Sequence, residues 1–288
     1  MGPRRGVDRA ALVGLCAAAF LLGCGGNAQV GFVNQERPSN TGGSQLVHHA
    51  HNQTGSKELD NDDEIVEPDR PMVGTAEERA LVHVHAGKEV CSGAMVSQRV
   101  VLTSHQCFRS QRGVGVVGKD LDPVKVEIAS SALTWTERQG KYVFAPSCDW
   151  KELDLVAIVL TQPAEWVKPL RVSQSPGAGA KVDALGFGRC AGEGARLKPK
   201  PAQVLSVEGD AIILGVALCR GDVGGPIIDG AGSHVVGLVS RRDDPEGSPR
   251  KTTTAVRLDT AGARNLVARA EAVANGGEVP TGPFGCER

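Results

Sequence analysis

The segment that most constrains the fold of this chain is Cys219-Arg220-Gly221-Asp222-Val223-Gly224-Gly225-Pro226. Its three glycines and its proline predict a tight turn around Asp222 and Val223. A Gly-Asp-x-Gly-Gly-Pro sequence on its own could be an ordinary turn, so its neighbours in the sequence matter. Two other distinctive stretches precede it, namely 91–107, which begins and ends with cysteine, and Asp154-Leu155-Val156-Ala157-Ile158-Val159-Leu160.

In this order, the three stretches resemble the motifs of the trypsin-like serine proteases. The last resembles Cys-x-Gly-Asp-Ser-Gly-Gly-Pro, with Val223 in the place of the nucleophilic serine. Residues 101–107 resemble Val-Leu-Thr-Ala-Ala-His-Cys, with Gln106 in the place of the catalytic histidine and His105 one residue early. Asp154 opens a segment that resembles the strand carrying the orienting aspartate. The resemblance covers roughly residues 72–275.

The resemblance places Gln106, Asp154 and Val223 at the three triad positions. A valine side chain has no atom that can attack a carbonyl group, and a glutamine amide is neither a base nor an acid near neutral pH. His105 is displaced because one residue in a helical turn rotates a side chain by about 100°. Losing an essential triad member costs on the order of a million-fold in turnover. We therefore expect no ordinary peptidase activity.

The same resemblance implies the other parts of a substrate site. The backbone N–H groups of Gly221 and Val223 correspond to an oxyanion hole. Ala217 corresponds to the floor of the specificity pocket and carries no charge that would select a basic substrate. Ser240, Arg241 and Arg242 correspond to the pocket edge, where the two arginines either crowd the mouth or point into solvent.

The implied fold is all-β, with two six-stranded antiparallel β-barrels and a C-terminal α-helix. The barrels are expected at about 72–172 and 178–258, the helix at about 259–275, and a tail at 276–288. A hydrophobic content of 41% supports a substantial core. Short apolar runs have the length of strands: Val114–Val117, Val124–Ile128, Leu153–Leu160, Ala211–Leu218 and Val235–Val239.

The first 23 residues are predicted to be a signal peptide. Arg4 and Arg5 precede an apolar stretch too short to span a bilayer. This stretch ends in Leu21-Leu22-Gly23-Cys24, which resembles a bacterial lipobox, so we expect export and acylation of Cys24. Gly25 after the cysteine suggests anchoring to the outer membrane, on its periplasmic or surface face. The alternative is a soluble secreted protein cleaved near Cys24.

Residues 24–71 are expected to form a flexible acidic tether. Its histidines His48, His49 and His51 are compatible with a metal site or with a plain polar linker. His83 and His85 alternate along a predicted strand and share a face. Two histidines without a third ligand are expected to be surface or hydrogen-bonded strand residues, and we predict neither a metal nor a small-molecule cofactor.

Export to an oxidising compartment predicts disulfides. The first is expected between Cys91 and Cys107. Cys16 leaves with the signal peptide and Cys24 carries lipid, so four other cysteines remain: Cys148, Cys190, Cys219 and Cys286. Of their three possible pairings, we favour Cys190–Cys219 with Cys148–Cys286.

In the resembled family, proteolysis frees an amine that pairs with the aspartate at the Asp222 position. The best match to such a new terminus is Met72-Val73-Gly74, but it follows Arg70-Pro71, a bond that resists trypsin-like cleavage. We therefore expect Asp222 to be exposed or to pair with another cation.

The functional expectation is a lipid-anchored, inactive homologue that binds or scaffolds an unidentified protein. A net charge of −1 and 3% aromatic residues disfavour a nucleic-acid partner. The alternatives are a peptidase that uses His105 with Thr103 or Ser104, and a purely structural envelope lipoprotein.

Overall fold

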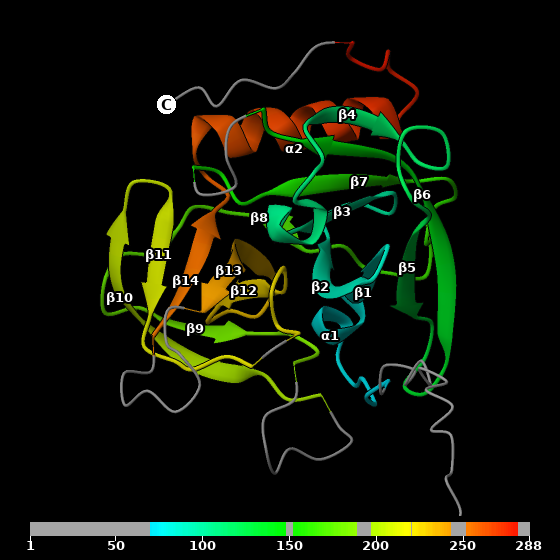
Figure 1. Cartoon of the computed structure of the whole chain (residues 1–288). Coiled ribbons are helices and arrows are strands. Elements are labelled where there is room, and N and C mark those ends of the chain that lie inside the picture. Colours follow the sequence, from blue (N-terminus) through cyan, green and yellow to red (C-terminus); the bar gives the residue numbers. More distant parts are fainter. Residues whose placement is uncertain (1–69, 148–151, 189–196, 220, 243–251, 282–288) are drawn as a thin grey trace, which may run out of the picture. The chain divides into compact units, whose positions relative to one another are not determined.

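Strands make up most of the regular secondary structure in the part of the chain that the structure, a computed structural model, describes (Figure 1). This part comprises residues 70–147, 152–188, 197–219, 221–242 and 252–281, all within one unit, Glu64–Arg288. Its elements are α1 (Ala76–Ala80), β1 (Leu81–Ala86), β2 (Glu89–Met95), β3 (Val100–Thr103), the short 3-10 helix η1 (His105–Phe108), β4 (Gly113–Val116), β5 (Val124–Ala129), β6 (Trp135–Ala145), β7 (Val156–Leu160), β8 (Arg171–Val172), β9 (Lys181–Ala184), β10 (Lys200–Glu208), β11 (Ala211–Leu214), β12 (Pro226–Asp229), β13 (His234–Arg242), β14 (Thr253–Arg257) and α2 (Ala261–Ala274).

The first barrel is a closed ring of six antiparallel strands. Hydrogen bonds join β6, β5, β1, β2, β3 and β7 in this order, and the pairing of β7 with β6 closes the ring. β4 pairs with β6 outside the ring. β3 and β7 are buried along their whole length, because their sequences are continuous apolar runs apart from Thr103.

The second barrel is also a closed six-stranded ring. Its order is β12, β9, β10, β11, β14 and β13, closed by the pairing of β12 with β13. β8 adds to β13 in parallel outside the ring. The ladder between β13 and β14 shifts register between Val239 and Arg241, so Ser240 lies at an irregularity of the kind that often redirects side chains near functional sites.

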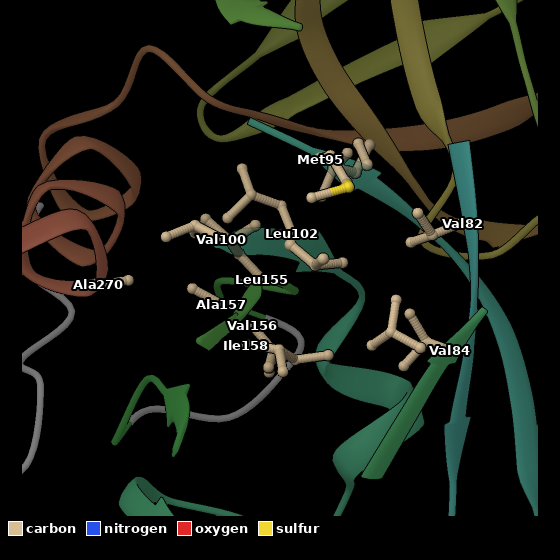
Figure 2. Packing of buried hydrophobic residues seen from close by; sticks show 14 of the residues in the cluster. Val82, Val84, Met95, Val100, Leu102, Leu155, Val156, Ala157, Ile158 and Ala270 are labelled. Atoms are coloured by element: carbon tan, nitrogen blue, oxygen red, sulfur yellow. The ribbon is translucent and has the colours of Figure 1, made fainter. Parts of the chain in front are cut away.

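The helix α2 packs on the first barrel, across β7, β3 and β6 (Figure 1). Its buried residues recur at helical spacing, and they include Ala263, Leu266 and Ala270. The Thr260 side chain caps the helix by accepting a hydrogen bond from the N–H of Ala263. Figure 2 shows the residues of β3 and β7 between the helix, marked by Ala270, and β1, marked by Val82 and Val84.

The predicted fold class is confirmed: two closed six-stranded antiparallel barrels with one C-terminal helix. Several strand limits differ from the apolar runs in the sequence. β7 begins at Val156, after the predicted Leu153, and β11 ends at Leu214, before the predicted Leu218. β13 extends at both ends of its run, to His234 and Arg242. Apolar runs mark buried residues, whereas strand limits depend on ladder hydrogen bonds, so the two need not coincide.

Candidate functional site

Asp154 is the most heavily hydrogen-bonded side chain where the two barrels meet. It is buried, with 4% of its surface exposed, just before β7. Its Oδ1 and Oδ2 accept from the Ser104 hydroxyl at 2.7 and 2.8 Å, and Oδ2 accepts from the Ser240 hydroxyl at 2.7 Å. Serine hydroxyls from both barrels therefore hold this carboxyl in a fixed orientation.

Gln106 completes the contacts of Asp154. Its backbone N–H donates to Oδ1 at 3.0 Å, and its side-chain Nε2 donates to Oδ2 at 2.8 Å. The same Nε2 donates to the backbone oxygen of Ser240 at 2.6 Å. A glutamine amide nitrogen has two hydrogens, and these two contacts use both. The side chain of Gln106 thus links the first barrel to β13 of the second.

His105 lies beside Gln106 in the sequence but makes a different contact. Both residues belong to η1, whose first turn is capped by Ser104. The His105 ring is buried, and its Nε2 lies 2.8 Å from the backbone oxygen of Gln111. The disulfide Cys91–Cys107, predicted from the sequence, is present and ties this turn to β2. His105 therefore contacts Gln111, and not the carboxyl of Asp154.

Val223 lies in a loop that is bonded to β2. The backbone oxygen of Val223 accepts from the N–H of Ser92 at 2.9 Å, and that of Gly221 accepts from the Ser92 hydroxyl at 2.7 Å. The Val223 side chain is half-buried and packs against the hydrophobic core. The backbone N–H groups of Gly221 and Val223, the predicted oxyanion pair, donate to no residue that the structure describes.

Position 224 of this loop requires glycine for structural reasons, independent of any catalytic role. Its φ is +84°, in the left-handed region that side chains other than glycine rarely adopt. A Cβ atom there would lie 2.2 Å from the backbone oxygen of Ser92 and 2.3 Å from the Thr103 hydroxyl. The loop therefore approaches β2 and β3 too closely for any larger residue.

Asp222 is buried and paired with Lys200. Only 1% of its surface is exposed, and its Oδ2 lies 2.8 Å from Nζ of Lys200. The N–H groups of Gly188 and Cys219 donate to its two oxygens at 2.9 and 2.7 Å. Burial raises the pKa of the Asp222 carboxyl, and Lys200 and the two backbone donors oppose that shift. Of the two outcomes expected for Asp222, exposure is wrong and pairing with another cation is correct.

The segment Met72-Val73-Gly74, which resembles a new N-terminus, and the residues before it contact groups other than Asp222. Arg70 pairs with Glu127 at 2.6 Å, the N–H of Val73 donates to Ala132 at 3.2 Å, and the Gly74 N–H donates to Glu78. Pro71 and Val73 are buried. Residues 70–74 are therefore anchored on the first barrel and on α1, while the cation on Asp222 comes from β10.

The predicted specificity pocket is described only in part. Ala217 is half-buried after β11, and Ser240 is buried. The backbones of Arg241 and Arg242 extend β13 and pair with Thr254 and Thr253, but their side chains lie outside the described residues. A pocket of about 280 Å³ lies on the first barrel and is lined by residues including Gln106, Phe108 and Leu121; Ala217, Val223 and Ser240 are not among them.

Several sequence predictions fall outside the described residues. They are the signal peptide, the lipidation site Cys24, the tether up to residue 69, and the cysteines Cys148, Cys190 and Cys286. Cys219 is disulfide-bonded, but not to Cys91 or Cys107, which bond each other. The pairing Cys190–Cys219 stays a prediction. Among the described helices, none combines the length and the apolar character needed to cross a membrane.

Sequence reasoning missed Lys200 in this site, and it expected another role for Ser104 than the one observed. Lys200 precedes Asp222 by 22 positions and reaches it because β10 pairs with β9, which also pairs with β12, the strand that follows the Asp222 loop. The only sequence signal was the expectation that Asp222 needs a cation. Ser104 was considered as a possible nucleophile, whereas here it caps η1 and orients Asp154.

A family model described as Trypsin matches residues 65–262, which is well over half of the chain. The chain therefore belongs to the trypsin family. Solved structures with a similar fold comprise 1048 chains. One of them is mouse neuropsin, described as a serine protease expressed in the limbic system of the brain. It is 18% identical with a TM-score of 0.52, and the match covers 70% of this chain and 98% of the neuropsin chain. At this identity the likeness shows the fold alone. None of the curated proteins matches this chain.

Proposed function

We propose that this chain is a catalytically inactive trypsin homologue that is lipid-anchored in the bacterial envelope and binds or scaffolds another protein. The observation that carries the proposal is the bonding of Gln106 to Asp154. The carboxyl that orients the catalytic histidine in active relatives is hydrogen-bonded to an amide, which has no proton-accepting nitrogen. Val223, at the expected nucleophile position, has no hydroxyl or thiol.

The contacts of the nearby hydroxyls also favour this proposal over a peptidase with unusual catalytic groups. Thr103 is fully buried, and its hydroxyl donates to the backbone oxygen of Ser92 at 2.7 Å. Ser104 is fully buried and donates to Asp154. A nucleophile must reach a substrate carbonyl, and hydroxyls in these positions would first have to leave their partners.

Retention of the fold without the catalytic groups favours a binding role. Lys200 satisfies Asp222 within the chain, so the loop around Val223 needs no proteolytic activation to be held in place. In this proposal the acidic tether, residues 24–71, displays a rigid double barrel from the lipid on Cys24. The partner protein binds the loops or the former cleft between the barrels.

The activity part is tested on the natural full chain with casein and with a serine-directed fluorophosphonate. The proposal predicts neither cleavage nor a covalent adduct. A fluorophosphonate label that disappears when Ser104 or Thr103 is replaced by alanine would instead favour a peptidase with unusual catalytic groups. Membership of the trypsin family is compatible with such an activity.

The binding part is tested by crosslinking in intact bacterial cells followed by mass spectrometry. We expect one recurrent protein partner, and we expect the variant Arg241→Ala/Arg242→Ala to capture less of it if the former cleft is the binding surface. Arg171→Ala, an exposed arginine on β8, is the matched control. Uniform crosslinking to abundant envelope proteins would support the structural-lipoprotein alternative. Detection of diacylglycerol on Cys24 by mass spectrometry tests the anchor.

A further inference from the structure

His83, His85 and Glu127 converge on one face of the first barrel. His83 and His85 alternate along β1, so their side chains share a face, and Glu127 on β5 is the cross-strand partner of His83. Oε2 of Glu127 lies 3.4 Å from Nδ1 of His83 and 3.4 Å from Nε2 of His85. The three potential ligand atoms all lie within 4.8 Å of one another.

The two histidine nitrogens are buried without a hydrogen-bond partner. Nδ1 of His83 and Nε2 of His85 are inaccessible to solvent, and at 3.4 Å from Glu127 neither makes an aligned hydrogen bond. The His83 side chain is only 2% exposed. Buried polar atoms without partners are unfavourable in folded proteins and call for an explanation such as a bound ion. Sequence reasoning expected both histidines to be at the surface or hydrogen-bonded, and this is wrong for the buried, unpartnered His83.

The spacing of these atoms suits coordination of one metal ion. Two ligands that each lie ~2.0–2.1 Å from a tetrahedral zinc ion are ~3.4 Å apart. The two nitrogen–oxygen distances match that value. Imidazole nitrogens and a carboxylate oxygen form a common ligand set for divalent transition metals.

The groups around the cluster support and shield it. Arg70 donates to both carboxyl oxygens of Glu127, from Nη2 to Oε1 at 2.6 Å and from Nε to Oε2 at 3.4 Å, and this fixes the carboxyl with Oε2 also near the histidines. Such outer contacts commonly orient a metal ligand. The His83 ring lies against Trp135 and Phe187, with ring centroids 5.4 and 3.7 Å away, and this makes one side of the cluster apolar. The His85 side chain is 22% exposed, so the protein surface lies close to the cluster on its other side.

We propose that His83, His85 and Glu127 bind a divalent first-row transition-metal ion, with zinc as the reference ion. Three protein ligands leave at least one coordination position for water or an external group. The ion clamps β1 to β5 next to Arg70, where the N-terminal segment joins the barrel. The site is separate from Asp154 and Gln106, and the inference holds whether or not the chain has peptidase activity.

Zinc binding by the full-length, untagged chain tests the site. Because His48, His49 and His51 could also hold metal, the reference protein carries alanine at these three positions. After chelator treatment, calorimetric titration with zinc sulfate should give one ion per chain. Glu127→Gln and His85→Gln should each weaken zinc binding on the order of 100-fold, since even outer-contact changes cost about 10–100-fold. His234→Gln, which alters a histidine paired with Asp229 elsewhere, should leave zinc binding unchanged.

A second measurement distinguishes the site from surface binding and does not depend on destabilising variants. Cobalt(II) should quench the fluorescence of Trp135, whose ring stacks on His83. Trp135→Phe should therefore abolish most of the quenching, whereas Trp166→Phe should retain it. Zinc should also raise the Tm of the reference protein in proportion to its binding. The proposal is overturned if the reference protein binds no zinc, if Glu127→Gln binds it equally well, or if Trp166→Phe removes the quenching instead.

Discussion

Gln106 bonds the two oxygens of Asp154 separately, with its backbone N–H on Oδ1 at 3.0 Å and its side-chain Nε2 on Oδ2 at 2.8 Å. Together with the hydroxyls of Ser104 and Ser240, these contacts leave Asp154 well satisfied without a histidine. The contacts of Asp154 therefore form a hydrogen-bond network that joins the two barrels. Its members are expected to contribute to stability.

The ion pair of Lys200 with Asp222 should contribute strongly to stability. Removing one partner of a buried pair leaves an uncompensated charge, which costs about 3–5 kcal/mol. Lys200→Met should therefore lower the free energy of unfolding by that amount in denaturant titrations, and adding Asp222→Asn should recover part of the loss. Lys125→Met, which breaks a half-exposed pair with Glu137, is the control and should cost about 0–1 kcal/mol. Equal effects of the two lysine variants would contradict this assignment.

Gly224→Ala should separate the cost of steric contact from the cost of backbone conformation. Gly232 has a similar φ, +78° against +84°, but a Cβ atom there meets nothing within 4 Å. Gly232→Ala should therefore show only the conformational cost of about 1–2 kcal/mol. Gly224→Ala should cost a further ~1–3 kcal/mol because its Cβ collides with Ser92 and Thr103. Thermal unfolding of both variants measures the difference, and equal losses would argue against the close approach of the loop.

Asp259 should contribute to the acid sensitivity of the protein. Burial alone would raise its pKa, but hydrogen bonds from Arg257 and Ser175 lower it from 3.8 to about 2. A carboxyl with a lowered pKa in the folded state stabilises above its unfolded pKa, and this contribution is lost as the pH falls from about 4 to about 2. Asp259→Asn should be less stable at neutral pH and should lose less stability than the natural chain across this window. Denaturant titrations at several pH values test this, and parallel pH profiles would contradict it.

The fold and the first disulfide could be predicted from the sequence because short local motifs indicate both. The segment 219–226 and the cysteines at 91 and 107 have fixed spacing, and they correctly indicated the barrels and the first disulfide. Lys200 and Glu127 could not be assigned in this way. Each meets its partner through strands that are distant in sequence, and neither carries a local signature. The contact of His105 with Gln111 also depended on how η1 turns, which spacing alone does not determine.

The central claim is that the natural chain is catalytically inactive. It is tested most directly by fluorophosphonate labelling of the natural chain in parallel with the double variant Gln106→His/Val223→Ser. The account predicts no covalent adduct on the natural chain, because the hydroxyls beside Asp154, those of Ser104 and Ser240, donate to its carboxyl, and the His105 ring contacts Gln111 instead. It predicts an adduct at position 223 of the double variant, since Asp154, Ser240 and the glycine loop remain in place. The account would be contradicted by an adduct on the natural chain that mass spectrometry maps to Ser104, to Thr103 or to another single residue close to His105.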